Sequence, residues 1–185
     1  HNVDKPTVWD PSIGFSSRML GFASVFNSGT YIGTDPAKMT YEDAVLISKE
    51  ISSIKPEIKF DLRREGSENA NIDPCSVDLV FTSPPYFDTE KYFSEPGQCW
   101  LDYPAIEDWN EFYLSPTLAV AKQAIKPNGK VVINISEKFK DLIVRAAASK
   151  GLKLEETIVM RVNADHFARS SGQASKNVEC FLVFS

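Results

Sequence analysis

The sequence is poor in the residues that carry covalent, redox and metal chemistry. Its three cysteines, Cys75, Cys99 and Cys180, are widely spaced and include no C-x-x-C pair, so neither a zinc site nor a disulfide framework is predicted. The only histidines are His1 and His166, which leaves a single ring for a Ser-His or Cys-His nucleophile. We therefore expect no metal, reduced thiols in a cytoplasmic protein, and a His166 that is more simply a residue of an exposed loop.

Long apolar runs and surplus positive charge are also missing. No stretch approaches the roughly 18 apolar residues of a membrane span, and no leader peptide is visible, so no membrane association is predicted. The formal net charge is -5, whereas proteins that bind nucleic acid unaided usually carry surplus Lys and Arg. Any contacts with phosphate groups must therefore come from a local group of basic side chains or from outside this chain. Because the chain begins with His1 rather than methionine, we expect its natural start to lie upstream.

The 185 residues are enough for one globular domain in which short apolar runs alternate with longer segments of helical period. Seven runs are predicted strands: residues 7–9, 31–35, 58–62, 77–83, 130–135, 152–162 and 178–184. Helices are predicted between them, around residues 19–26, 44–54, 106–125 and 139–146. Because no helix fits between the last two strands, they are predicted to be antiparallel. The fold class is therefore α/β, a seven-stranded, mostly parallel sheet with an antiparallel last strand and helices on both faces.

Local signals predict where these helices and turns begin and end. Ser16 or Ser17 is the expected cap of the first helix, and Thr40 that of the second. Pro116 behind Ser115 predicts a break in the third helical segment, with a new helix starting there. The KPNG stretch at residues 126–129 predicts a turn before the fifth strand.

Parallel sheets bind ligands at the carboxyl ends of their strands, which directs attention to three loops. In DPSIGFSSR, residues 10–18, Gly14 allows close approach to the backbone, and the following helix offers free N–H groups. Asp35 ends the next strand about 20 residues later, where an acidic residue accepts hydrogen bonds from ribose hydroxyls. The two loops favour an adenosine-containing cofactor. In the third loop, TSPPY at residues 82–86, two prolines end a strand and stiffen the turn that follows.

The segments DPSIGFSSRM, YIGTD, EGSEN and TSPPY, in that order, resemble the amino-methyltransferases that use S-adenosylmethionine to methylate the exocyclic nitrogen of cytosine or adenine in DNA. The resemblance covers nearly the whole chain, and TSPPY is its most specific element. It implies that residues 1–185 form a single catalytic domain with the Rossmann-like methyltransferase fold. It also implies a DNA substrate and a target-recognition region, and since none follows TSPPY here, we expect a separate domain or subunit to supply it.

The resemblance assigns catalysis to Ser83, Pro84, Pro85 and Tyr86. An exocyclic amine is a poor nucleophile because its lone pair is delocalised into the ring, so the site must hold acceptors where charge develops. The implied acceptors are the Ser83 side chain and the Pro84 carbonyl, while Tyr86 stacks on the base after it has left the duplex. Serine before the two prolines is more frequent in the cytosine enzymes.

The resemblance also assigns the cofactor contacts to three segments. The methionine end falls to the first loop, the ribose to the second and the adenine neighbourhood to EGSEN: Asp10, Pro11, Ser12, Gly14, Asp35, Ser67 and Glu68. The family often has an acidic residue directly after the glycine of this third segment, where Ser67 stands here.

Other substrates and roles stay open at this stage. Similar motifs act on RNA adenine or on protein glutamine, although the glutamine enzymes use asparagine where this chain has Ser83. A non-catalytic partner subunit with the same fold is a further alternative. Cys75 follows a proline, as does the nucleophile of enzymes that methylate carbon 5 of cytosine, but here the pair precedes the fourth strand.

Two groups of residues outside these motifs are weaker candidates. Trp100, Tyr103 and Trp109 are expected either to line a base pocket or to pack in the core. The polar stretch at residues 163–177, with Arg169 and Lys176, is expected either to contact substrate or to form a solvated loop.

Overall fold

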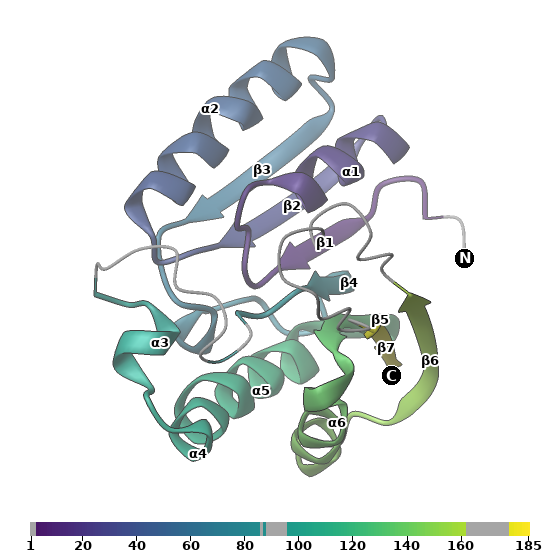
Figure 1. The fold of residues 1–185 in the computed structure, drawn as a ribbon. Helices are drawn as coiled ribbons and strands as arrows, with labels where there is room; N and C mark the ends of the chain where they lie inside the picture. Colours follow the sequence, from purple (N-terminus) through teal and green to yellow (C-terminus); the bar gives the residue numbers. More distant parts are fainter. Residues whose placement is uncertain (1–2, 86, 88–95, 162–177) are drawn as a thin grey trace.

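The computed structural model describes residues 3–85, 87, 96–161 and 178–185, and their strands form one seven-stranded sheet in the order β3-β2-β1-β4-β5-β7-β6 (Figure 1). The strands are β1 (Thr7–Asp10), β2 (Gly29–Thr34), β3 (Ile58–Arg63), β4 (Val77–Thr82), β5 (Ile125–Ser136), β6 (Leu154–Arg161) and β7 (Val178–Phe184). β7 is antiparallel to both of its neighbours, and the other pairs are parallel. The predicted fold class is confirmed.

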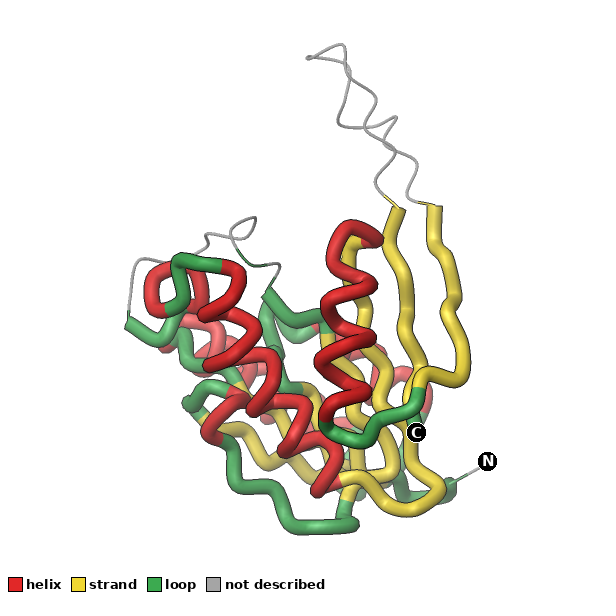
Figure 2. Tube along the Cα trace, turned by 90° about the horizontal axis from the view of Figure 1, so that it is seen from below, coloured by secondary structure: helices red, strands yellow, loops and turns green. Residues whose placement is uncertain are grey.

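The helices cover both faces of the sheet, as the two views show (Figures 1 and 2). One face carries α1 (Ser17–Val25) and α2 (Lys38–Ile54). The other carries α4 (Ile106–Asp108), the π-helix η2 (Trp109–Leu114), α5 (Ser115–Ala124) and α6 (Lys140–Ser149). Three short elements complete the described part: α3 (Cys99–Asp102) and the 3-10 helices η1 (Ser67–Asn69) and η3 (Glu137–Phe139).

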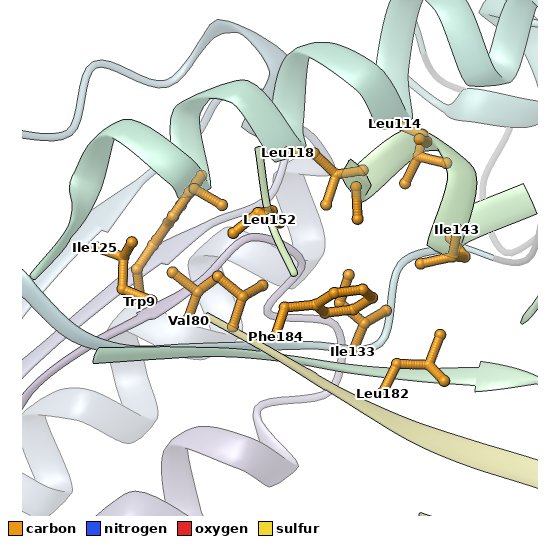
Figure 3. Close-up of a cluster of buried hydrophobic side chains, with 14 of the residues drawn as sticks. Trp9, Val80, Leu114, Leu118, Ile125, Ile133, Ile143, Leu152, Leu182 and Phe184 are labelled. Carbon is orange, nitrogen blue, oxygen red and sulfur yellow. The ribbon is translucent and has the colours of Figure 1, made fainter. Parts of the chain in front are cut away.

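Each face of the sheet has its own hydrophobic core. On the α5 and α6 side, Trp9, Leu118 and Phe184 belong to a buried cluster that includes residues of five strands and of both helices (Figure 3). On the other side, Met19 and Ala44 bring α1 and α2 against the sheet. Complete burial of such a side chain contributes roughly 1.5–3 kcal/mol, so the two clusters fix the strand ends relative to one another.

The predicted caps of the first two helices are partly wrong. Ser16 does precede α1, but its backbone is left-handed and its side chain makes no capping hydrogen bond with the described residues. Thr40 lies inside α2, which begins at Lys38 after Ala37. The start is fixed locally instead: the Asp35 carboxylate accepts a hydrogen bond from the Ala37 N–H two residues later, an Asx turn that directly precedes the helix.

Pro116 does not break the third helical segment. α4, η2 and α5 follow one another without interruption, and the proline lies in the first turn of α5. A proline removes the hydrogen bond to the carbonyl four residues earlier and clashes with that carbonyl in an α-helix. The i→i+5 pattern of η2, directly before it, accommodates the proline without a cap.

The predicted KPNG turn lies within β5 as a bulge. β4 advances from Val77 to Leu79 while β5 advances from Ile125 to Lys130, so residues 126–129 bulge out between these paired positions. A β-carbon at Gly129 would lie 2.8 Å from a β4 carbonyl oxygen, which explains the glycine at the end of the bulge.

Candidate cofactor and substrate site

A cavity of about 230 Å³ lies at the carboxyl edge of the sheet, where the loops after β1, β2, β3 and β4 meet α3 and η2. The structure brings most of the predicted site residues to its wall: Pro11, Ser12, Gly14, Asp35, Ser67, Glu68, Ser83 and Pro85. Asp10 and Pro84 do not line it, and Tyr86 lies outside the described residues. The four sequence segments are therefore parts of one concave site.

Asp10 lies behind the cavity wall as a fully buried carboxylate at the end of β1. It accepts hydrogen bonds from the Tyr31 hydroxyl at 2.6 Å, the Arg18 Nε at 2.8 Å and the Ser12 N–H at 3.1 Å. Burial raises its pKa, and the Arg18 guanidinium offsets part of this rise. Because Ser12 and Arg18 both line the cavity, the effect of Asp10 on a ligand passes through these two residues.

Gly14 and Asp35 join the first two loops directly. Gly14 adopts the left-handed conformation, with φ +53, and its N–H donates to Asp35 Oδ2 at 3.1 Å. Asp35 Oδ1 accepts from the Ala37 N–H at 3.0 Å. Burial raises the pKa of Asp35 to about 6, and these two backbone donors only partly oppose it. The carboxylate therefore has both oxygens fixed at the cavity wall.

A network of buried hydroxyl groups connects the first loop to the EGSEN segment through η2 and α5. The Tyr113 hydroxyl lies 3.2 Å from Ser12 Oγ and also bonds the Ser67 side chain. Ser67 Oγ in turn lies 2.9 Å from Thr117 Oγ1. Burial raises the pKa of Tyr113 well above its usual value, so the phenol is neutral and can share its hydrogen with these partners.

Glu68 and α3 close the other end of the cavity. The Tyr103 hydroxyl donates to Glu68 Oε1 at 3.5 Å, and burial raises the pKa of Glu68. Cys99 and Trp100, at the start of α3, also line the cavity, and burial raises the pKa of the Cys99 thiol. This end of the cavity is thus walled by the Glu68 carboxyl group, the Cys99 thiol and the Trp100 side chain.

The TSPPY loop contributes two residues to the cavity and anchors a third below it. Ser83 and Pro85 line the cavity, while Pro84 is buried and faces a second, smaller cavity beside Thr82. The Phe87 N–H donates to the Pro85 carbonyl at 2.8 Å, which closes a tight turn. A proline ring fixed in the core holds the loop backbone rigidly next to the cavity.

The other candidate residues named from the sequence differ in whether they lie at the cavity. Trp100 lines the cavity and Tyr103 bonds Glu68, whereas Trp109 is fully buried in the core against Tyr113. Cys75 is exposed before β4, at the opposite edge of the sheet, so the carbon-5 nucleophile hypothesis is wrong. His166, Arg169 and Lys176 lie outside the described residues.

Several cavity residues were not predicted. Arg18 follows the glycine loop and could have been inferred as the only cation near Gly14, but no pattern indicated the remaining ones: Thr40, Gly97, Gln98, Cys99 and Tyr113. They come from α2, η2, α3 and the two residues directly before α3, and the packing of these segments across the strand ends is a tertiary feature.

Two further chemical features were sought in the part of the chain that the structure describes. Its histidine, cysteine and acidic side chains form no group able to hold a metal ion. None of its helices is both long and apolar enough to cross a membrane.

Comparison with known proteins identifies the family. A family model described as DNA methylase, for enzymes of the N6 and N4 amino-methyltransferase type, matches residues 77–185, more than half of the chain. The chain belongs to this DNA methylase family. The match begins at β4 and includes the TSPPY loop, which confirms the resemblance seen in the sequence. Among curated proteins, none matches this chain.

Solved structures with low sequence identity share the fold. A TehB-like SAM-dependent methyltransferase from Corynebacterium glutamicum is 16% identical over 100% of this chain and 82% of its own, with a TM-score of 0.59. A SAM-dependent methyltransferase from Methanosarcina mazei is 8% identical over 99% and 93%, with a TM-score of 0.67. Geranyl diphosphate C-methyltransferase from Streptomyces coelicolor is 10% identical over 98% and 72%, with a TM-score of 0.66. These similarities confirm the predicted methyltransferase fold.

Family membership confirms S-adenosylmethionine as the cofactor of this chain. The residues present fit this ligand. A ribose needs a fixed acceptor for its hydroxyls, which Asp35 offers at the cavity wall. A charged amino-acid end needs polar groups, which Ser12, Gly14 and Arg18 offer on the adjoining wall.

Proposed function

We propose that this chain methylates the exocyclic amino group of cytosine, or of adenine, in DNA. The observation that supports the proposal most directly is that Ser83 and Pro85 share one cavity with Gly14 and Asp35. A methyl transfer needs the donor site and the amine site to adjoin, because reactants held in a near-attack geometry gain much of the rate from proximity.

The cofactor half of the cavity would be held by residues of the first three loops. Asp35 would accept hydrogen bonds from the ribose hydroxyls, and Ser67 and Glu68 would lie near the adenine. Arg18 is a cation at the wall and would pair with the carboxylate of the methionine end. When bound, S-adenosylmethionine supplies an electrophilic methyl group on a sulfonium.

The substrate half would be organised by the TSPPY loop. Ser83 Oγ and the Pro84 carbonyl would accept the hydrogen bonds of the target amine, which raises electron density on its nitrogen as charge develops. Pro84 and Pro85, which follow Ser83, have no backbone N–H that could compete with the amine for these acceptors. Tyr86 would stack on the flipped base, a contact worth about 1–3 kcal/mol. Serine at position 83 favours cytosine as the target base.

The proposal treats residues 1–185 as one catalytic domain that relies on a separate recognition domain or subunit for its DNA sequence. The formal net charge of -5 supports this division, because phosphate contacts need local positive charge. All three cysteines are free thiols, which fits the predicted cytoplasmic location.

Transfer of a labelled methyl group from S-adenosylmethionine to unmethylated DNA tests the proposal. Ser83→Ala is expected to lower the transfer rate about 100-fold, the effect of removing one well-placed polar group from a transition state. Its cofactor Kd, measured by calorimetry, should stay at the wild-type value. Ser53→Ala on the exposed side of α2 is the matched control and should change neither quantity.

Mass spectrometry of the digested DNA then separates N4-methylcytosine from N6-methyladenine. Label that enters RNA or protein glutamine instead would contradict the DNA proposal. A folded protein that binds no cofactor at millimolar concentration would instead be a non-catalytic partner subunit.

A further inference from the structure

The hydroxyl of Ser83 begins a chain of hydrogen bonds that crosses three strands of the sheet. Ser83 Oγ donates to Asn134 Oδ1 at 3.4 Å, and Asn134 Nδ2 donates to Glu179 Oε2 at 3.3 Å. Ser83 follows β4, Asn134 lies in β5 and Glu179 lies in β7. Neither Asn134 nor Glu179 belongs to the motifs that define the cofactor or substrate loops.

The strand register places these three residues side by side. Thr82 pairs with Ile133, so the next residue on each parallel strand brings Ser83 beside Asn134. On the antiparallel side, Ser136 pairs with Glu179, which makes Asn134 and Glu179 diagonal neighbours on one face. The arrangement therefore follows from the sheet itself and does not depend on a mobile loop.

The chemistry of the three groups fixes the direction of each bond. The Glu179 carboxylate oxygen accepts from the amide NH₂ of Asn134, so the amide oxygen of Asn134 faces Ser83. That oxygen also only accepts, so the single hydrogen of the Ser83 hydroxyl points to Asn134. A hydroxyl whose hydrogen is committed in this way can only accept from another donor.

We propose that Asn134 and Glu179 are positioning residues that keep Ser83 an acceptor toward the target amine, an inference that rests on the proposed function. A hydroxyl that rotated freely would turn its hydrogen toward the amine in part of the population. That orientation removes an acceptor and repels the N–H groups of the substrate. The 3.3 and 3.4 Å bonds are of a length that tightens when substrate fills a site.

Glu179→Gln tests this direction with almost no change in shape. An amide at position 179 can either donate or accept, so the Asn134 side chain is free to turn over and donate to Ser83 instead. We expect kcat for methyl transfer to fall about tenfold, the value of one hydrogen bond, with the cofactor Kd unchanged. Glu155→Gln is the matched control, since it replaces an exposed carboxylate of β6 that is paired with Lys130 of β5, and it should leave kcat unchanged.

The double variant Asn134→Asp with Glu179→Gln provides a rescue. Its new carboxylate accepts from Ser83 on one side and from the new amide on the other, so the hydroxyl again points away from the substrate. Most of the lost kcat should return. Wild-type kcat in Glu179→Gln, or a double variant no faster than Glu179→Gln alone, would overturn the inference.

The inference and the proposed function can fail separately. If the wild-type protein transfers no methyl group to DNA, the proposed function is refuted. The energetic coupling of Ser83 to Glu179 through the hydrogen-bond chain is then tested by urea unfolding of Ser83→Ala, Glu179→Gln and the double variant. A smaller midpoint shift in the combination than the sum of the single shifts supports the chain, and strictly additive shifts overturn it.

Discussion

Cofactor binding should weaken as the pH falls, because it depends on the ionised carboxylate of Asp35. Burial raises the pKa of this group to about 6, and the hydrogen bonds from Gly14 and Ala37 oppose the shift only in part. Protonation turns one of its oxygens from an acceptor into a donor. A ribose hydroxyl that donates to that oxygen in the ionised form then loses its acceptor.

The size of the effect follows from the titration. At pH 5, one unit below a pKa of about 6, roughly one molecule in eleven keeps the ionised form, so affinity should be about tenfold lower than at pH 7.5. Folding responds in the opposite direction. The folded carboxyl binds its proton more tightly than the unfolded one, whose pKa is 3.8, so Asp35 makes the unliganded protein less stable as the pH rises from 4 to 6.

Calorimetric titration with S-adenosylmethionine between pH 5 and 7.5 measures this dependence. Asp35→Asn should bind more weakly and lose most of the slope, and any remaining slope would report Asp10 and Glu68, whose pKa values burial also raises. A wild-type affinity that is constant over this range, or an unchanged slope in Asp35→Asn, would refute the role of Asp35.

Two substitutions test the supports behind the cavity wall. Tyr113→Phe removes the hydroxyl that bonds Ser12, so the free energy of unfolding in urea should fall by about 1 kcal/mol. The cofactor Kd should rise severalfold. An unchanged Kd would mean that the Ser12 loop does not need this hydrogen bond. Asp10→Ala leaves the Arg18 guanidinium without its buried partner, so the free energy of unfolding, measured by thermal denaturation, should fall by about 3–5 kcal/mol. A decrease of under about 1 kcal/mol would show that Arg18 finds another acceptor or water.

The sheet and the loops at its carboxyl edge could be predicted because they depend on local patterns. Apolar runs of strand length predicted all seven strands, and the lack of room in the sequence for a helix between the last two runs correctly predicted that these strands are antiparallel. Since the carboxyl ends of parallel strands meet at one edge, Gly14, Asp35 and Ser83 could be placed together before the structure was known.

The remaining features depend on contacts between distant segments. Asp35 is held by the Gly14 N–H of the first loop and accepts the Ala37 N–H in a turn before α2, so the helix begins earlier than the local signal at Thr40 indicated. Asp10 ends β1, where a ligand residue would lie, but its side chain is buried against Arg18 and Tyr31 behind the cavity wall. Hydrophobic period alone could not indicate these positions, since each is set by which charged or polar partner arrives from another element.

The π-helix η2 limits how the helix above the sheet can vary in length. A π-helical turn holds one residue more than an α-helical turn, and each α-helical residue advances the side chains by about 100°. A deletion within Trp109–Leu114 would restore regular winding, but it would swing the preceding side chains around the axis relative to Thr117. The first loop and the EGSEN segment, which bond Tyr113 and Thr117, would then lose their shared partner, so the cavity constrains the rotation of a helix that carries none of the sequence motifs.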